Sequence, residues 1–214
     1  MSKIKIVYVT SSDFKVVENE AFLRSYEIEK GKLAGSMFEF EIRKVQIKEV
    51  LEIDLVTMVL AEVTAAYSQI KVPCIVEHAG LVFDGHSTYP GGLTKPMWNS
   101  LGDKFIEETH SAGRKAIARA VVAYCDGKSA HTFVGETRGF IADRARGSRQ
   151  FYWDTVFIPD KSEGAPGDKS YAELVDDSSF GLQFKMSKLS QSSKAMAEFL
   201  RFRIHRPPEL WPRS

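Results

Sequence analysis

The sequence predicts a protein of the α/β class, because strand-like and helix-like segments alternate from its first residues onward. Residues 4–9 form an apolar run of strand length, and Ser11, Ser12 and Asp13 after them are typical helix-capping residues. A helical pattern follows over residues 14–30. Apolar and charged residues then alternate over residues 38–45, which predicts a half-buried strand parallel to the first. These segments form a strand-helix-strand unit.

The remaining elements follow from periodicity and turn residues. Apolar residues at helical spacing over residues 55–69 predict an amphipathic helix that leads into a buried strand at Cys74. Residues 95–112 have a third helical pattern. A hairpin is expected with strands at 116–124 and 129–134, followed by a strand near 139–141, a polar loop at 161–168 and a closing helix at 190–204.

Length and composition limit the possible classes of protein. The 214 residues suit one domain, which we expect over residues 1–206 in two lobes, with an irregular tail at 207–214. The 29 basic and 28 acidic residues leave a net charge of +1, which gives no reason to expect a nucleic-acid or membrane partner. Cys74 and Cys125 suit free thiols, and no segment has the apolar length of a signal peptide or a membrane span. We therefore expect a cytoplasmic protein.

The most informative stretch is residues 72–83, where Glu77 and His78 interrupt an apolar run. It predicts a buried strand with Glu77 at its end. A Glu-His pair alone is more often structural, but other motifs follow it. They are Tyr-Pro-Gly-Gly-Leu-Thr-Lys at 89–95, Gly-Glu-Thr-Arg-Gly at 135–139, Phe-Tyr-Trp-Asp-Thr-Val-Phe-Ile-Pro-Asp at 151–160 and Tyr-Ala-Glu-Leu at 171–174.

In order and spacing these motifs resemble the inosine triphosphate pyrophosphatase family, the noncanonical purine nucleoside triphosphate pyrophosphatases, over residues 4–202. The resemblance implies an elongated, curved mixed sheet with flanking helices and two lobes around a nucleotide cleft. It also implies a homodimer that hydrolyses a nucleoside triphosphate to a monophosphate and pyrophosphate. Mg²⁺ is the expected cofactor, with Mn²⁺ as the alternative.

Phosphate contacts are implied at two places. Thr10 and Lys15 match the family's opening motif, with Ser11 and Ser12 replacing a glycine and an asparagine. A helix N-terminus can bind an anion, although plain helix capping is the commoner role of such residues. Lys95 matches the family's lysine after its Pro-Gly turn, where a cation helps to neutralise the triphosphate.

The acidic residues of the family imply a metal site and a catalytic group. Glu52, with Glu49 as the alternative, and Glu77 match the family's metal-site acids, and Glu77 is also a catalytic candidate. His78 replaces an aspartate of the family. A histidine can act as the general base towards water, so His78 is the leading catalytic candidate. The other interpretation is a site that binds nucleotide and hydrolyses it poorly.

The base pocket is implied by Phe151, Trp153 and Asp154, whose aromatic rings and carboxylate suit a purine. A core strand with Phe151 and Trp153 on one face is compatible with that role. Tyr152 stands where the family has glycine. Ser190-Gln191-Ser192 replaces the family's Ser-His-Arg, and the Gln191 amide can still donate to a keto oxygen. Lys185 and Lys188 could supply the charge that the family places just upstream of this motif, although the preferred interpretation of both is a surface lysine.

Three hypotheses about function remain open at this point. The first is hydrolysis of a noncanonical purine triphosphate. The second is a catalytically degenerate nucleotide-binding sensor or regulatory protein, which the replacements at His78 and Gln191 favour. The third is an enzyme shifted to another nucleotide substrate.

Overall fold

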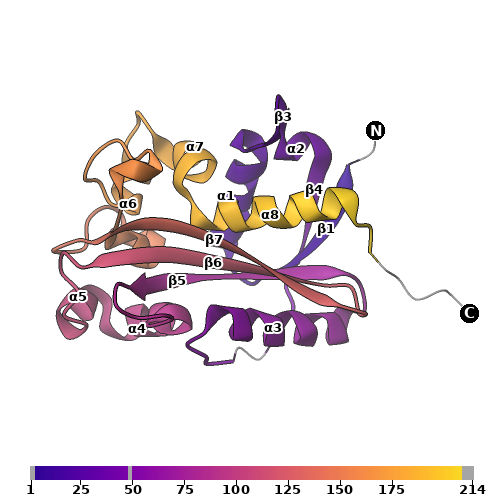
Figure 1. The fold of residues 1–214 in the computed structure, drawn as a ribbon, viewed down its shortest axis with the longest axis horizontal. Helices are drawn as coiled ribbons and strands as arrows, with labels where there is room; N and C mark the ends of the chain where they lie inside the picture. Colours follow the sequence, from indigo (N-terminus) through magenta and orange to yellow (C-terminus); the bar gives the residue numbers. More distant parts are fainter. Residues whose placement is uncertain (1–2, 48–49, 209–214) are drawn as a thin grey trace, which may run out of the picture.

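The computed structural model describes residues 3–47 and 50–208, and of Phe151 it describes the backbone alone. Its centre is a mixed six-stranded sheet in the order β4-β1-β5-β6-β7-β8 (Figure 1). The strands are β1 Ile4–Val9, β4 Phe38–Arg43, β5 Cys74–Phe83, β6 Lys115–Cys125, β7 Ala130–Ile141 and β8 Phe157–Pro159. β1 is parallel to β4 and β5, and the later pairs are antiparallel. The predicted α/β class is confirmed.

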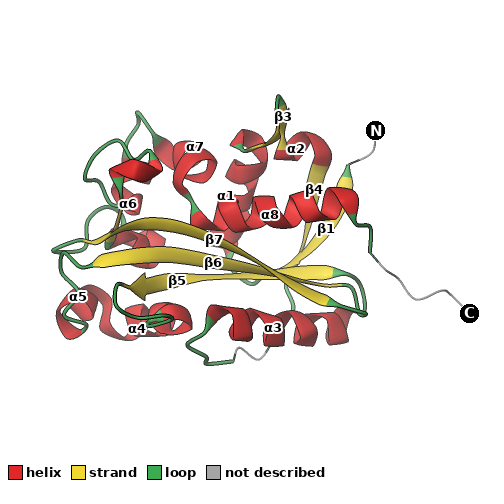
Figure 2. Ribbon diagram, in the orientation of Figure 1, coloured by secondary structure: helices red, strands yellow, loops and turns green. Residues whose placement is uncertain are grey.

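Helices cover both faces of the sheet. On one face lie α3 Leu55–Ile70, α4 Thr94–Leu101 and α5 Phe105–Glu108, drawn below the strands in Figure 1. The other face carries α1 Asp13–Ser25 and α8 Gln191–His205, with α2 Ala34–Met37, α6 Tyr171–Asp176 and α7 Gly181–Phe184 beyond them. A small hairpin of β2 Glu27–Glu29 and β3 Lys32–Leu33 stands apart from the main sheet (Figure 2).

The two faces of β5 pack into different cores, because successive side chains of a strand point to opposite sides. Ile75 belongs to the core under α1 and α8, together with Tyr8 of β1. Cys74 and Val76 belong to the core under α3. The alternation sends Glu77 toward α1 and α8, and His78 toward α3. Both cysteines are buried and free, as expected, and burial raises the pKa of the Cys74 thiol to about 12.

Several boundaries differ from the sequence prediction. The helix expected to reach residue 30 ends at Ser25, because Tyr26 turns to extended backbone and Glu27–Glu29 pairs with β3. The helix predicted over residues 95–112 is interrupted at Gly102, whose φ of +53° no right-handed helix adopts. The hairpin strand after Ser129 continues through residues 139–141 without a break. Residues 149–155 form a 3₁₀ helix, so the alternative of a core strand at Phe151 was wrong.

The expected end of the buried strand was also wrong. β5 continues for six residues beyond Glu77. The strand that ends is its neighbour β1, which pairs with β5 only at Val7–Cys74 and Tyr8–Ile75. Over residues 76–81, β6 is the only strand partner of β5 in the described part of the chain. This leaves one edge of β5 free at Glu77 and His78, opposite the start of α1.

Candidate active site

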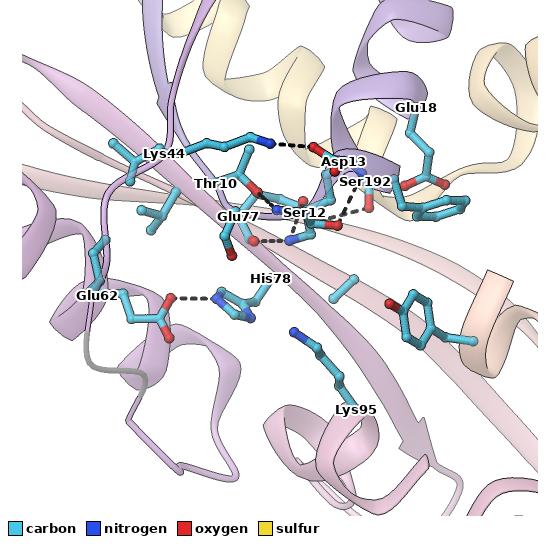
Figure 3. Close-up of a pocket in the computed structure, with 18 of the residues that line it drawn as sticks. Thr10, Ser12, Asp13, Glu18, Lys44, Glu62, Glu77, His78, Lys95 and Ser192 are labelled. Atoms are coloured by element: carbon cyan, nitrogen blue, oxygen red, sulfur yellow. Dashed lines mark hydrogen bonds and ion pairs between the residues drawn. The ribbon is translucent and has the colours of Figure 1, made fainter. Parts of the chain in front are cut away.

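A cavity of about 800 Å³ opens at this free edge of β5. Its wall is built by the end of β1, the first turn of α1, the middle of β5, α3, α4, the 3₁₀ helix at residues 149–155 and the start of α8. Eight of the residues expected in a site line it, namely Thr10, Lys15, Glu77, His78, Lys95, Trp153, Asp154 and Gln191. Segments far apart in the sequence therefore bring most of the expected residues together (Figure 3).

The first turn of α1 presents Lys15 to the cavity. Ser12 caps the helix by accepting from the Lys15 backbone N–H at 3.4 Å, and the Ser12 N–H donates to Thr10 Oγ1 at 3.2 Å. Both polar side chains thus order the turn. The Lys15 ammonium lies 2.8 Å from Glu77 Oε2 and also donates to the Glu77 carbonyl oxygen.

Glu77 is surrounded by donors from three different elements. Its carboxylate accepts from Lys15 on α1, from the Tyr8 hydroxyl on β1 at 3.1 Å and from the Ser192 hydroxyl on α8 at 3.0 Å. Burial alone would raise the pKa of the Glu77 carboxyl, but the charge and hydrogen bond of Lys15, together with the other groups around the carboxylate, outweigh burial and lower that pKa. Glu77 is therefore an ionised, rigidly held carboxylate that fixes Lys15 at the cavity wall.

His78 projects to the opposite face of β5 and meets α3. Its Nε2 lies 2.5 Å from Oε2 of Glu62, whose side chain is only 4% exposed. The other oxygen of Glu62 is buried and has no hydrogen-bond partner among the described residues. The sequence analysis missed Glu62. A signal existed, because Glu62 stands on the apolar face of α3 beside Val59 and Val63, where a charge needs a partner.

Lys95 approaches the cavity from the side of α4. The turn before it packs tightly: Gly91 has a φ of +54°, and the Gly92 N–H donates to the Ile53 carbonyl at 2.9 Å. This contact explains the glycines of the motif, since a side chain at Gly91 would be strained. Lys95 is exposed, and no ion-pair partner for it is found within residues 3–47 and 50–208. Its charge is available to an anion.

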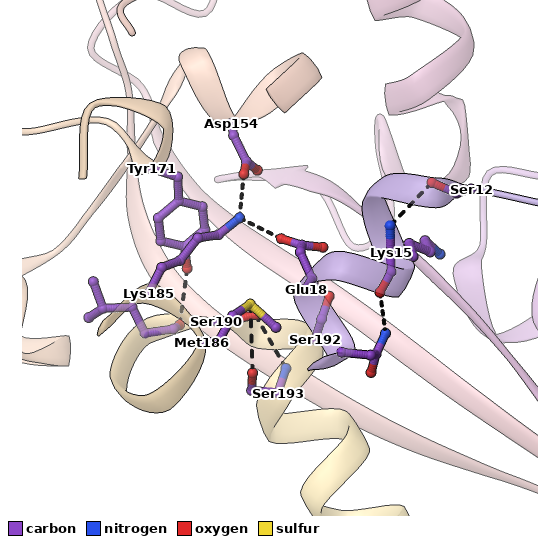
Figure 4. Close-up of polar contacts among 12 residues, drawn as sticks. Ser12, Lys15, Glu18, Asp154, Tyr171, Lys185, Met186, Ser190, Ser192 and Ser193 are labelled. Carbon is purple, nitrogen blue, oxygen red and sulfur yellow. Dashed lines mark hydrogen bonds and ion pairs between the residues drawn. The ribbon is translucent and has the colours of Figure 1, made fainter. Parts of the chain in front are cut away.

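A buried lysine dominates the aromatic end of the cavity. Lys185, at the start of a π-helical turn over residues 185–189, pairs with Glu18 of α1 at 2.8 Å and with Asp154 (Figure 4). Its ammonium also lies 5.0 Å from the centre of the Tyr171 ring. The interpretation of Lys185 as a surface lysine was wrong, because its side chain is 2% exposed; Lys188 is exposed, as expected.

The three charges of this Lys185 triad perturb one another. Burial raises the pKa of Asp154 and of Glu18 even though Lys185 acts to lower both. Burial would lower the pKa of Lys185, but the two carboxylates raise it. Asp154 is therefore already paired with Lys185 through one of its oxygens in the absence of a ligand.

Trp153 and Tyr152 form the aromatic part of the wall. Trp153 is 7% exposed and packs edge-on against Phe157, with 6.4 Å between ring centres. Tyr152 is 43% exposed and has a φ of +51°, a left-handed conformation that favours glycine. The backbone therefore keeps the shape of a glycine turn although the residue is tyrosine. The Phe151 side chain lies outside the described part of the structure.

Gln191 opens α8, directly after the N-cap Ser190. It is 4% exposed and lines the cavity, and its Oε1 is buried without a hydrogen-bond partner among the described residues. Buried amide oxygens are normally hydrogen-bonded. An acceptor left open in a cavity wall can meet a ligand.

The described residues do not form a metal-binding cage. The Glu52 carboxylate accepts from the backbone N–H groups of Ile53 at 2.7 Å and Asp54 at 3.1 Å, and Glu52 does not line the cavity. Glu49 lies outside the described residues. Glu77 already accepts from three donors. Within the part of the chain that the structure describes, no three His, Cys, Asp or Glu side chains are grouped to hold a metal ion.

Comparison with known proteins identifies the group to which the fold and these motifs belong. The family model of the Ham1 family matches residues 6–202. The inosine triphosphate pyrophosphatase of Kluyveromyces lactis is 29% identical over 205 residues, covering 92% of this chain and 95% of that protein. A dITP/XTP pyrophosphatase of Saccharolobus solfataricus is 27% identical over 201 residues, covering 93% of each.

A solved structure of a Ham1 protein from Coxiella burnetii superposes with a TM-score of 0.64 at 18% identity. It covers 93% of this chain and 99% of that one, and at this identity it supports the fold alone. The resemblance found in the sequence is thereby confirmed at the level of the family.

Proposed function

The chain belongs to the Ham1 family, and from this premise we propose that it hydrolyses a noncanonical purine nucleoside triphosphate. The reaction breaks the bond between the α-phosphorus and the bridging oxygen, and gives a nucleoside monophosphate and pyrophosphate. The observation that carries the proposal is the meeting of Lys15, Glu77, His78 and Lys95 in one cavity that also has an aromatic wall.

The cavity suits the two halves of a nucleotide. Lys15 and Lys95 supply positive charge for the triphosphate, the Thr10 hydroxyl can donate to a phosphate oxygen, and the first turn of α1 adds backbone donors. At the other end Trp153 walls the base, while Gln191 and the Asp154 oxygen that does not pair with Lys185 supply its polar contacts.

Catalysis is assigned to two adjacent residues of β5, Glu77 and His78. His78 accepts the proton of the attacking water, and Glu77 holds Lys15 where it can bind a phosphate oxygen. Because these neighbours point to opposite faces of the strand, Glu77 can hold the Lys15 ammonium while His78 contacts the attacking water.

A divalent cation, Mg²⁺ or alternatively Mn²⁺, is proposed to enter with the triphosphate. The expected ligands Glu52 and Glu77 form no preformed cage, so the phosphates are the main ligands of the cation in this proposal. Bound there, the cation would neutralise phosphate charge.

The oligomeric state, the domain organisation and the cellular location are part of the same proposal. We propose a homodimer of chains in which residues 1–206 form one two-lobed domain. A cytoplasmic location is supported by the two free, buried cysteines. No helix among the described residues has the length and apolarity needed to cross a membrane.

A pyrophosphate-release screen tests the proposed function. The full chain is incubated with ITP, dITP, XTP and the four standard ribonucleoside triphosphates, with Mg²⁺ or with Mn²⁺. Release from the noncanonical purines supports the proposal. Tight nucleotide binding without release from any of them supports the binding-only alternative, which the pyrophosphatase names of the relatives do not favour.

A further inference from the structure

Glu62 and His78 form a pair that the sequence motifs do not contain. The two residues come from different elements, α3 and β5, and their Nε2–Oε2 distance of 2.5 Å is the length of a short charge-assisted hydrogen bond. Figure 3 shows His78 between Glu62 on one side and the Lys95 side chain on the other. The pair therefore lies at the cavity wall.

The contact with Glu62 determines which ring nitrogen of the neutral His78 imidazole carries the hydrogen. An ionised carboxylate only accepts hydrogen bonds, so Nε2 carries the hydrogen that Glu62 receives. In the neutral ring Nδ1 is then the basic nitrogen. Nδ1 takes part in none of the hydrogen bonds found among the described residues. It is the nitrogen left to serve a ligand or a water.

We infer that Glu62 is a positioning residue, which holds His78 in the tautomer and orientation that let Nδ1 act as the general base. This inference rests on the proposed hydrolysis. In the step, a water proton moves to Nδ1 while the water oxygen bonds to the α-phosphorus. The bond from that phosphorus to the bridging oxygen breaks, and its electron pair leaves with pyrophosphate. Glu62 stabilises the imidazolium that forms.

The burial of Glu62 supports a purpose beyond packing. A carboxylate that is 4% exposed on an apolar helix face is costly, and its second oxygen gains no hydrogen bond among the described residues. His78 is the partner that the structure gives it, and in turn Glu62 is the acid that meets His78 from α3. Across the strand, Glu77 points away to Lys15, Tyr8 and Ser192.

A double-variant cycle tests the inference with the full chain. The variants are Glu62→Gln, His78→Ala and both together, and the readouts are kcat and KM for pyrophosphate release from the best substrate of the wild type. We expect His78→Ala to lower kcat about 100-fold or more and Glu62→Gln about 10-fold, with KM nearly unchanged. The double variant should equal His78→Ala within about twofold, because Glu62 acts through His78.

The matched control is Glu163→Gln, which makes the same chemical change in an ion pair with Lys194 outside the cavity. It should keep the wild-type kcat. An unchanged kcat in Glu62→Gln overturns the inference, and so does an equal loss from Glu62→Gln with and without His78.

A second readout does not depend on turnover. Nitrogen-15 NMR of labelled histidine reports which ring nitrogen of His78 carries the hydrogen. The wild type should show the Nε2–H form alone, whereas Glu62→Leu should show a mixture of the two tautomers. A pure Nε2–H form in both proteins refutes the positioning role. A wild type that shows the Nε2–H form but releases no pyrophosphate refutes the proposed hydrolysis instead.

Discussion

Replacing Lys185 by methionine removes the one cation of the buried triad with Glu18 and Asp154. The Lys185 side chain is 2% exposed, so solvent cannot take its place beside the two carboxylates. Breaking a buried ion pair by removing one partner costs about 3–5 kcal/mol. Methionine keeps most of the apolar stem beside the Tyr171 ring, so the loss is chiefly electrostatic. For a chain of this size the loss lowers Tm by roughly 6–20 °C at neutral pH.

The change of this stability deficit with pH follows from the pKa shifts of Glu18 and Asp154. Burial already raises the pKa of Glu18 and of Asp154 in the folded protein, and without Lys185 both rise further. A carboxyl with a raised folded pKa favours folding in its protonated form, and that stability is lost as the pH rises through the folded pKa. The deficit of Lys185→Met should therefore be largest near pH 7.5 and shrink toward pH 5.

Urea unfolding followed by circular dichroism at both pH values measures the deficit. Lys188→Met is the matched control, because Lys188 is exposed in the same π-helical turn, and it should change the free energy of unfolding by less than about 0.5 kcal/mol. A loss below about 1 kcal/mol in Lys185→Met at pH 7.5, or a deficit that grows toward pH 5, refutes the electrostatic account of the triad.

Three further predictions concern ligand contacts. Lys15→Met and Lys95→Met should each weaken triphosphate binding by on the order of 1.5–3 kcal/mol in calorimetry, and wild-type affinity in both would contradict the phosphate assignment. Gln191→Leu should leave the free energy of unfolding unchanged or higher, because the buried Oε1 has no partner, yet lower kcat/KM for purine triphosphates. An unaltered kcat/KM would remove Gln191 from the base pocket. Chelation of divalent cations should abolish pyrophosphate release, while calorimetry should still detect binding of the metal-free nucleotide to the protein. Full activity in excess chelator would contradict the proposed role of the cation.

Local chemistry made much of the fold predictable. Strand and helix periods predicted β1, α3 and α8 within one or two residues, and Ser12 caps α1 as its residue type indicates. The predictions that failed were the ends of elements that depend on contacts with other segments of the chain. The early end of α1 depends on the pairing of Glu27–Glu29 with β3, which the helical pattern does not reveal.

The candidate site was predictable where motifs mark it and hidden where long-range pairs build it. The motifs indicated His78 and Asp154, but neither partner was found, because Glu62 lies on another element and Lys185 joins residues 31 and 167 positions away. The alternation of a strand predicts that Glu77 and His78 face opposite sides. An acid on the apolar face of α3 would then have indicated Glu62 as the partner of His78.

Hydrolysis in water enriched in oxygen-18 tests the central claim most directly. Attack of water on the α-phosphorus places the heavy oxygen in the nucleoside monophosphate, and mass spectrometry of the products should find it there and not in the pyrophosphate. Label in the pyrophosphate, or products of phosphate and nucleoside diphosphate, would contradict the account of this cavity as a nucleoside triphosphate pyrophosphatase site.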